Sequence, residues 1–196
     1  MCRIISDLCK GEFQQMAKTK KDKDDRFQRY IDKSYNKTAS VLANSCRAVA
    51  ILATSTIPSP VSSQYLQDVE NSSFNYGKNL GIAFQLMDDW LDFAATAEQL
   101  GKPAAADLKL GLATAPVLFA SSKFPQLEPM IARRFSHPGD VEAAFNAVFE
   151  SDGLERTKDL ATQHCKDAII ALDHLAESDY KDSLIGLTET VLNRMN

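Results

Sequence analysis

Glycine-rich phosphate loops are missing from this chain of 196 residues, which contains neither a Walker pattern nor a GxGxxG motif. Those motifs cradle phosphates with backbone N–H groups, so two common modes of nucleotide binding are excluded. No apolar run reaches the length of a membrane-spanning helix. Alternation of apolar and polar residues persists nowhere along the chain, which leaves no basis for a β-sheet.

Cysteine is sparse and charge is nearly balanced. The four cysteines show no CxxC spacing and no nearby paired histidines: Cys2, Cys9, Cys46 and Cys165. This spacing argues against a zinc site and a disulfide framework, and we expect reduced, mostly buried thiols in an intracellular compartment. The net charge of −4 implies no general attraction to nucleic acid. Residues 1–13 lack the features of a signal or transit peptide.

The chain has instead the periodicity of α-helices. Two long helices are predicted over 26–53 and 62–96, separated by Pro58 and Pro60, which break helices. Shorter helices are predicted over six further ranges: 1–17, 114–123, 125–135, 141–151, 153–176 and 179–194. An irregular loop is expected over 98–113. The pattern predicts a single domain over 1–196, an all-α bundle with sites built between facing helices.

The segment 81–92 is the most informative stretch, because it places acids on one side of an otherwise apolar helix. At about 100° per residue, Asp88, Asp89 and Asp92 share a narrow arc with Gln85. Three carboxylates in apolar surroundings lose hydration and repel one another unless cations join them. Since Mg²⁺ prefers oxygen ligands and bridges carboxylates to substrate phosphates, the pattern predicts a magnesium site. The alternative is a solvated acidic face.

A metal site that binds phosphates also needs cationic partners. Lys37 stands where its predicted helix turns apolar, so its ammonium could contact a phosphate; a solvated or snorkelling lysine is the plainer alternative. Lys102 follows Gly101 and precedes Pro103 in the loop after the acidic helix. That loop can fold back over the same end of the site.

Four motifs, in order along the chain, resemble those of one known family. The sequence FQLMDDWLD at 84–92 resembles FQxxDDxxD, the second aspartate-rich motif of the trans-polyprenyl diphosphate synthases. The segments 101–103 and 107–116 resemble the GKP and DLxxGxxTxP pieces that follow it in the family. Upstream, 37–39 matches the KTA motif and 10–15 resembles the GExxQ helix. The resemblance covers essentially the whole chain.

The finer match, at 45–48 and 133–141, is to the eukaryotic synthases that make the ubiquinone side chain. The resemblance implies an isoprenoid-synthase-type helical bundle and a mitochondrial location. It also implies Mg²⁺-dependent condensation of an allylic diphosphate with isopentenyl diphosphate. The expected partners are these two substrates and further prenyl synthase subunits, in a homo- or hetero-oligomer, with peripheral membrane association through the product. No nucleic acid is expected.

The resemblance also assigns roles to particular residues. Catalytic roles are implied for three side chains: Lys37, Gln85 and Lys102. Substrate binding is implied for five: Lys37, Thr38, Phe84, Gln85 and Lys102. Metal binding is implied for three: Asp88, Asp89 and Asp92. Asp88 is the expected direct ligand, whereas its two neighbours bind the metal or support it. Plain core packing is the alternative role for Phe84.

Two features depart from the family. Leu112 stands where many members have a lysine, and nearby Lys109 is a candidate substitute. The sequence contains one DDxxD, whereas the family's first aspartate-rich motif lies upstream of the part that this chain resembles. We therefore expect the N-terminal helices of the bundle to be missing, the helices at 41–53 and 77–91 to expose apolar patches, and the chain to be inactive alone. The alternative is a non-catalytic partner or regulatory subunit of a full-length synthase.

Overall fold

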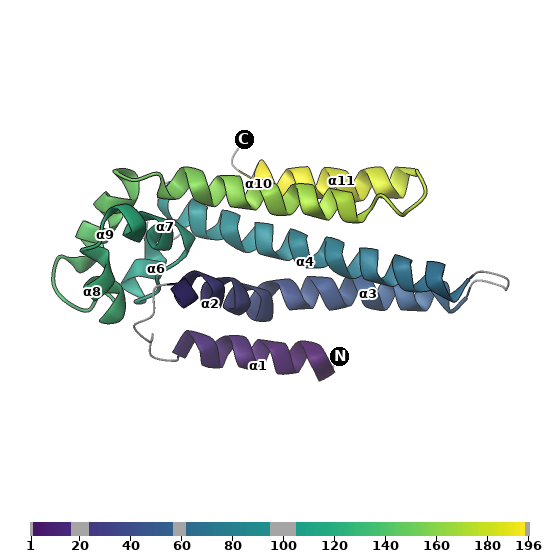
Figure 1. Cartoon of the computed structure of the whole chain (residues 1–196), viewed down its shortest axis with the longest axis horizontal. Coiled ribbons are helices and arrows are strands. Elements are labelled where there is room, and N and C mark those ends of the chain that lie inside the picture. Colours follow the sequence, from purple (N-terminus) through teal and green to yellow (C-terminus); the bar gives the residue numbers. More distant parts are fainter. Residues whose placement is uncertain (1, 17–23, 57–61, 95–104, 195–196) are drawn as a thin grey trace. The chain divides into compact units, whose positions relative to one another are not determined.

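The structure is a computed structural model, and it describes residues 2–16, 24–56, 62–94 and 105–194. Within these ranges every regular element is a helix, as the periodicity predicts (Figure 1). Four elements come first along the chain: α1 (Cys2–Met16), α2 (Asp24–Ser34), η1 (Tyr35–Ala39) and α3 (Ser40–Thr54). Seven follow: α4 (Ser63–Ala94), α6 (Ala106–Lys109), α7 (Ala115–Lys123), α8 (Leu127–Ala132), α9 (Asp140–Phe149), α10 (Gly153–Ala171) and α11 (Asp179–Leu192).

The chain divides into two compact units. Unit 1 draws its described residues from three ranges: Met1–Gln15, Asp32–Gln85 and Ala161–Asn196. Unit 2 draws them from two: Met16–Ile31 and Leu86–Leu160. Helix α4 is continuous across this division, so Gln85 belongs to unit 1 and the three aspartates that follow it belong to unit 2. The prediction of a single domain stays a prediction.

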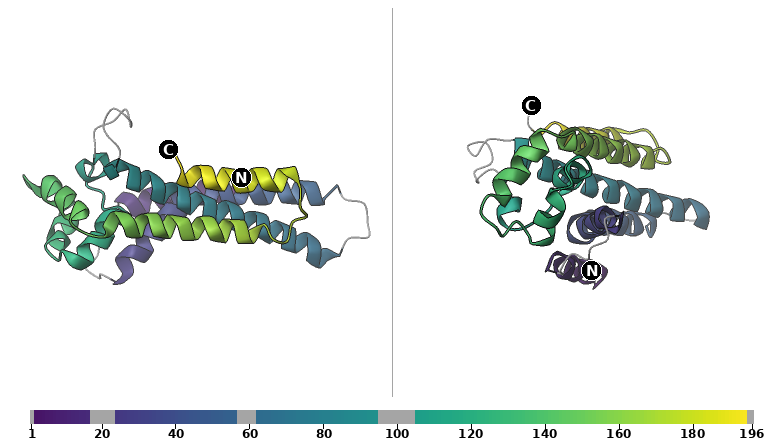
Figure 2. Two further views of the ribbon diagram at one scale, coloured as in Figure 1. Left: turned by 90° about the horizontal axis from the view of Figure 1, so that it is seen from above. Right: turned by 60° about the vertical axis from the view of Figure 1, so that its left-hand side comes forward.

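Helix α4 lies unusually close to η1 and α3 in unit 1 (Figures 1 and 2). A Cβ atom added to Gly77 would stand 2.6 Å from the carbonyl oxygen of Leu42, and one on Gly81 would stand 2.5 Å from the Cα of Ala39. Side chains do not approach one another so closely in folded proteins, so only glycine permits this packing. The two glycines of this helix therefore mark the place where another part of the backbone comes closest to it.

The long helix predicted over 26–53 is interrupted by the π-helical element η1. The backbone N–H of Ser40 donates to the carbonyl of Tyr35, five residues earlier. A π-turn accommodates one residue more than an α-turn, and such bulges often occur at functional sites. Lys37 and Thr38, two of the predicted site residues, lie in this turn.

Two segments of unit 2 differ from the prediction: the end of α8 and the loop that contains α6. The helix expected over 125–135 ends at Ala132, because Arg134 and Phe135 adopt the left-handed region, with φ of 57° and 52°. The range predicted to be an irregular loop contains the four-residue helix α6. The prediction was wrong there because one turn is too short to show periodicity.

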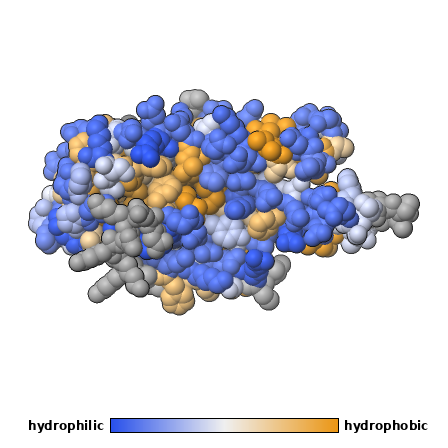
Figure 3. Space-filling model, in the orientation of Figure 1, coloured by the Kyte–Doolittle hydropathy of each residue, from blue (hydrophilic) through white to orange (hydrophobic). Residues whose placement is uncertain are grey.

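Exposure of apolar side chains follows the prediction in one segment and contradicts it in another. On α3, Val49 and Leu52 are 67% and 68% exposed, as expected for 41–53. Figure 3 shows hydrophobic side chains at the surface where α10 and α11 overlap in this view, and both Ile170 of α10 and Leu187 of α11 are exposed. The apolar side chains of 77–91 form no exposed patch, however, since Ile82 and Leu86 are fully buried. The prediction was wrong because η1 and α3, two elements of this chain, already cover its glycine-containing part.

Two further expectations concern cysteines and membranes. The cysteines whose side chains the structure describes are all free thiols, and only Cys165 is buried, whereas Cys46 is half-buried and Cys9 is exposed. The expectation of mostly buried thiols is therefore wrong. Among the described helices, none combines the length and the apolar character that a membrane span requires.

Candidate functional site

The three aspartates of α4 have different surroundings. Asp88 is exposed to solvent, whereas Asp89 and Asp92 are 2% and 0% exposed. Two of the three carboxylates are therefore not part of a solvated acidic face. A buried carboxylate needs hydrogen bonds or cations to remain ionised, so the partners of these two groups decide what the site can do.

Asp89 accepts a hydrogen bond from a buried tyrosine. The hydroxyl of Tyr30, on α2, donates to Oδ2 of Asp89 over 2.5 Å. The ring of Tyr30 lies 5.7 Å from that of Phe27, which in turn lies 4.8 Å from Phe119 of α7. This aromatic cluster fixes the tyrosine, and the short bond to a carboxylate fixes Asp89. Sequence reasoning did not identify Tyr30, whose only signal was its place on the apolar side of a predicted helix.

Asp92 organises the start of α6. Its Oδ1 accepts the backbone N–H of Ala106 at 3.2 Å, and its Oδ2 accepts that of Asp107 at 3.1 Å. Its backbone carbonyl also accepts the N–H of Ala105 at 2.9 Å. The carboxylate therefore satisfies backbone donors at a helix start, where negative charge is favourable. It ties the acidic helix to the segment that resembles DLxxGxxTxP.

The donor set can be compared with what Mg²⁺ requires. Within the described ranges, no group of three or more His, Cys, Asp and Glu side chains is arranged to hold a metal ion. Asp92 and Asp89 already accept hydrogen bonds from protein donors. The exposed carboxylate of Asp88 would fit a Mg²⁺ ion whose other oxygen ligands came mostly from substrate and water, a common arrangement for this ion.

In unit 1, the structure brings Thr38 and Gln85 together. The hydroxyl of Thr38 donates to Oε1 of Gln85 over 2.8 Å, which links η1 to α4. In this bond Oε1 of the Gln85 amide faces the hydroxyl of Thr38. Both residues were predicted to bind substrate, and their motifs lie 47 positions apart in the sequence.

Lys37, the predicted diphosphate ligand, has partners on α1. Its Nζ donates to Oε1 of Gln15 over 2.8 Å and lies 3.1 Å from Oε1 of Glu12. The side chains of Lys37 and Glu12 are 38% and 55% exposed. The ammonium is therefore oriented by two side chains and still open to solvent. Sequence reasoning identified Lys37 but not these partners, although both lie in the segment that resembles GExxQ.

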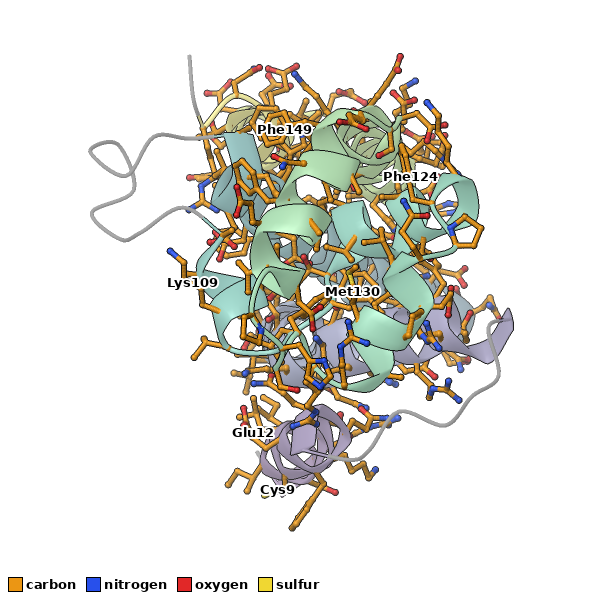
Figure 4. All side chains as sticks on the ribbon, turned by 90° about the vertical axis from the view of Figure 1, so that its left-hand side faces the viewer. Cys9, Glu12, Lys109, Phe124, Met130 and Phe149 are labelled. Atoms are coloured by element: carbon orange, nitrogen blue, oxygen red, sulfur yellow. The ribbon has the colours of Figure 1, made fainter. Side chains whose placement is uncertain are left out.

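The remaining predicted residues are Phe84 and Lys102. The guanidinium carbon of Arg194 lies 4.4 Å from the centre of the half-buried Phe84 ring, so plain core packing does not describe this side chain. Lys102, with Gly101 and Pro103, lies outside the described residues. Lys109, the candidate substitute for the missing lysine, is exposed and extends outward from α6 (Figure 4).

Residues 1–148 match the family described as Polyprenyl synthetase. This match covers more than half of the sequence, and the chain therefore belongs to the polyprenyl synthetase family. The resemblance that four short motifs indicated is confirmed.

Three relatives illustrate the similarity. The human all trans-polyprenyl-diphosphate synthase is 48% identical over 194 residues, covering 99% of this chain and 44% of its own length. The probable mitochondrial hexaprenyl pyrophosphate synthase of Yarrowia lipolytica is 45% identical, covering 97% and 41%. The mitochondrial solanesyl-diphosphate synthase 1 of Oryza sativa is 40% identical, covering 99% and 44%. The chain spans less than half the length of these relatives.

Solved structures show the same fold. The apo form of a medium/long-chain prenyl pyrophosphate synthase from Arabidopsis matches with a TM-score of 0.81 and 34% identity, over 98% of this chain and 63% of that one. A polyprenyl synthase from Caulobacter crescentus, complexed with calcium and isoprenyl diphosphate, matches with a TM-score of 0.82 and 29% identity, over 100% and 58%. The predicted all-α, isoprenoid-synthase-type architecture is confirmed.

Proposed function

We propose that this chain carries the second aspartate-rich motif of a Mg²⁺-dependent polyprenyl diphosphate synthase that supplies the ubiquinone side chain. The observation that carries the proposal is the acidic stripe of α4, where two buried carboxylates are hydrogen-bonded in place and Asp88 is exposed. Gln85, one turn earlier on the same helix, is fixed by Thr38. The names of the relatives support the reaction class, which is prenyl transfer from an allylic diphosphate to isopentenyl diphosphate.

In this proposal, the residues of the chain assist departure of the allylic diphosphate. Asp88 would hold a Mg²⁺ ion, which when bound would supply Lewis-acid stabilisation of the negative charge on the leaving group. Lys37 and Lys102 add positive charge at the diphosphate, and such charge is most effective when it is held in place before the reaction. Asp89 and Asp92 support the metal site through Tyr30 and the start of α6.

Two further residues act on the organic part of the substrate. The Gln85 amide, directed by Thr38, presents polar atoms where positive charge develops and where a proton is later lost. Phe84 contributes an apolar surface that keeps water from the allylic cation. The sequence contains a single DDxxD, and the chain alone is expected to have little or no synthase activity.

The experiment that tests the proposal measures binding of inorganic pyrophosphate in the presence of Mg²⁺ by isothermal titration calorimetry. We expect Asp88→Ala to weaken binding about tenfold or more, since even the loss of a group that supports a metal ligand costs about that much. The matched control is Asp159→Ala, which removes an exposed carboxylate from α10 and is expected to bind as the unmodified chain does. Equal binding by the Asp88→Ala variant would contradict the proposal.

The setting of the reaction is part of the proposal. Relatives named mitochondrial support a mitochondrial location. We further propose that the chain works in an oligomer with other prenyl synthase subunits and reaches the membrane only through its long product. Nucleic acid has no place in this function.

A second candidate function is that of a non-catalytic partner or regulatory subunit of a full-length synthase. The exposed apolar residues of α3 favour it, because such side chains suit contact with another protein. This function requires that the chain changes the activity of a full-length synthase in a mixture, and that Asp88→Ala leaves the change intact. If Asp88→Ala abolishes the change, the partner function is excluded.

A further inference from the structure

The helix that resembles GExxQ is joined to the π-turn that carries Lys37. A Cβ atom added to Gly11 would stand 3.0 Å from the backbone nitrogen of Lys37, so α1 meets η1 at a glycine. The amide nitrogen of Asn36 donates to Oε1 of Gln14 over 3.0 Å. Figure 4 labels Glu12 on α1, one of the side chains of this contact. The contact therefore involves backbone packing and side chains on both elements.

The two partners of the Lys37 ammonium differ in charge. Gln15 accepts its hydrogen bond at 2.8 Å with a neutral amide oxygen, whereas Glu12 approaches to 3.1 Å with a carboxylate. An ion pair as exposed as this one is weak, because water and salt screen it. A diphosphate carries more negative charge than one carboxylate, so its Coulomb attraction to an ammonium is the stronger of the two. It can therefore displace Glu12 from Lys37.

We propose that Gln15 and Glu12 are positioning residues for Lys37 with opposite effects on diphosphate binding. Gln15 holds the ammonium in the direction in which it meets the diphosphate. Glu12 is an exchangeable counter-ion, which neutralises Lys37 in the empty state and is displaced by the incoming anion. This inference rests on the proposed function, since it assumes that Lys37 binds a diphosphate.

The test uses the opposite effects that substitutions of Gln15 and Glu12 are expected to have on pyrophosphate affinity. Loss of the Gln15 amide leaves the ammonium free to adopt several rotamers, so binding has to order it and becomes weaker. Replacement of Glu12 by glutamine removes a competing negative charge, so binding becomes tighter. A role in stability alone would not tighten binding at one position and weaken it at the other.

The experiment is a calorimetric titration of the full chain with inorganic pyrophosphate and Mg²⁺ at low ionic strength. We expect Glu12→Gln to bind about threefold more tightly and Gln15→Ala about fivefold more weakly, the size typical of an exposed charge pair or one hydrogen bond. Glu142→Gln on α9 and Gln67→Ala on α4 are matched controls at exposed positions, and both are expected to bind like the unmodified chain. In the background of Lys37→Ala, the Glu12 and Gln15 substitutions are expected to have no effect.

The possible results separate the inference from the function on which it rests. If Lys37→Ala weakens binding but Glu12→Gln and Gln15→Ala behave like their controls, the positioning inference is wrong and the proposed function stands. The same holds if both variants shift binding in one direction. If Lys37→Ala binds like the unmodified chain, or if the unmodified chain does not bind pyrophosphate, both are overturned. Thermal melting of each variant identifies any loss of folding.

Discussion

The charged carboxylate of Asp140 stabilises the turn between α8 and α9. Its two carboxylate oxygens accept hydrogen bonds from Nη2 and Nε of Arg133, at 2.6 and 2.7 Å, and Oδ2 also accepts the backbone N–H of His137 at 3.1 Å. The Arg133 guanidinium lowers the pKa of Asp140 to about 2. This bidentate pair holds the turn between α8 and α9, in which Gly139 has a positive φ of 86°.

The lowered pKa of Asp140 predicts how stability responds to acid. The unfolded chain has the ordinary aspartate pKa of about 4, so the stabilisation is complete above that pH and is lost as the pH falls from about 4 to 2. Asp140→Asn is therefore expected to lose stability at pH 7 and to show a shallower decline over this acid range. Urea denaturation at a series of pH values measures both effects. Asp173→Asn, at an exposed position after α10, is the control, and an unchanged acid profile for Asp140→Asn would contradict the prediction.

Tyr30 is the second residue for which the structure makes a prediction. Tyr30→Phe removes the hydroxyl that donates to the buried Asp89, and leaving a buried acceptor short of a hydrogen bond costs about 1–3 kcal/mol. We expect the free energy of unfolding to fall by this amount in urea denaturation. The matched control is Tyr180→Phe on α11, whose side chain is exposed. Equal stability of the two variants would show that the Asp89 contact does not stabilise the fold.

The contacts of single residues show which parts of the site the sequence could predict and which it could not. The sequence pattern identified Lys37, Gln85 and the aspartates as chemically unusual, because polar and charged residues within apolar stretches are visible in the sequence itself. It missed Tyr30 and Glu12, since nothing in periodicity pairs Tyr30 with a residue 59 positions away. The roles assigned to the site residues stay predictions.

Among the elements, the contact between α4 and η1 provides the sharpest test of packing. Gly81→Ala would place a Cβ 2.5 Å from the Cα of Ala39, and backbone on both sides would have to move. Overpacking of this kind costs about 1–3 kcal/mol. The expected result is a lower melting temperature and, because Thr38 lies next to Ala39, weaker binding of Mg²⁺ and pyrophosphate.

The control for this prediction is Gly186→Ala in α11, where an added Cβ meets nothing within 4 Å. Alanine is favoured over glycine inside a helix by about 0.5–1 kcal/mol, so this variant should be more stable than the unmodified chain. Stabilisation by both substitutions would mean that α4 and η1 do not meet as closely as described.

At the level of elements, sequence predicted which segments are helical but not their detailed geometry. The periods of α-helix and π-turn are too similar to separate over the five residues of η1, so the interruption at Lys37 was not visible. Likewise, the end of α8 depends on two residues with positive φ, Arg134 and Phe135, which are not glycines and give no warning in composition. Existence and order of helices were predictable because they follow from apolar spacing alone.

For the whole molecule, the exposed apolar residues of α3 predict self-association. Val49 and Leu52 lie on one side of a helix and leave apolar area in water, which favours contact with another protein surface. The chain is expected to be oligomeric or poorly soluble at micromolar concentration. Replacing both residues with lysine is expected to shift the distribution towards monomer in light scattering.

A control is needed, because two added positive charges can raise solubility by themselves. Ser122→Lys combined with Asn193→Lys makes the same change in charge at exposed positions outside α3. This variant is expected to associate as the unmodified chain does. A monodisperse monomer for the unmodified chain would contradict the prediction outright.

The π-turn at η1 also determines how this chain can tolerate changes of length. Deletion of one residue from Tyr35–Ala39 would restore ordinary α-helical hydrogen bonding and leave the helical frame on either side nearly unchanged, because the π-turn absorbs one extra residue. A single deletion within the α-helical turns of α2 or α3 would instead turn the residues on its two sides by about 100° about the helix axis. Shortening of η1 should therefore spare the fold more than shortening of its neighbours, while it removes the wide turn in which Lys37 and Thr38 lie.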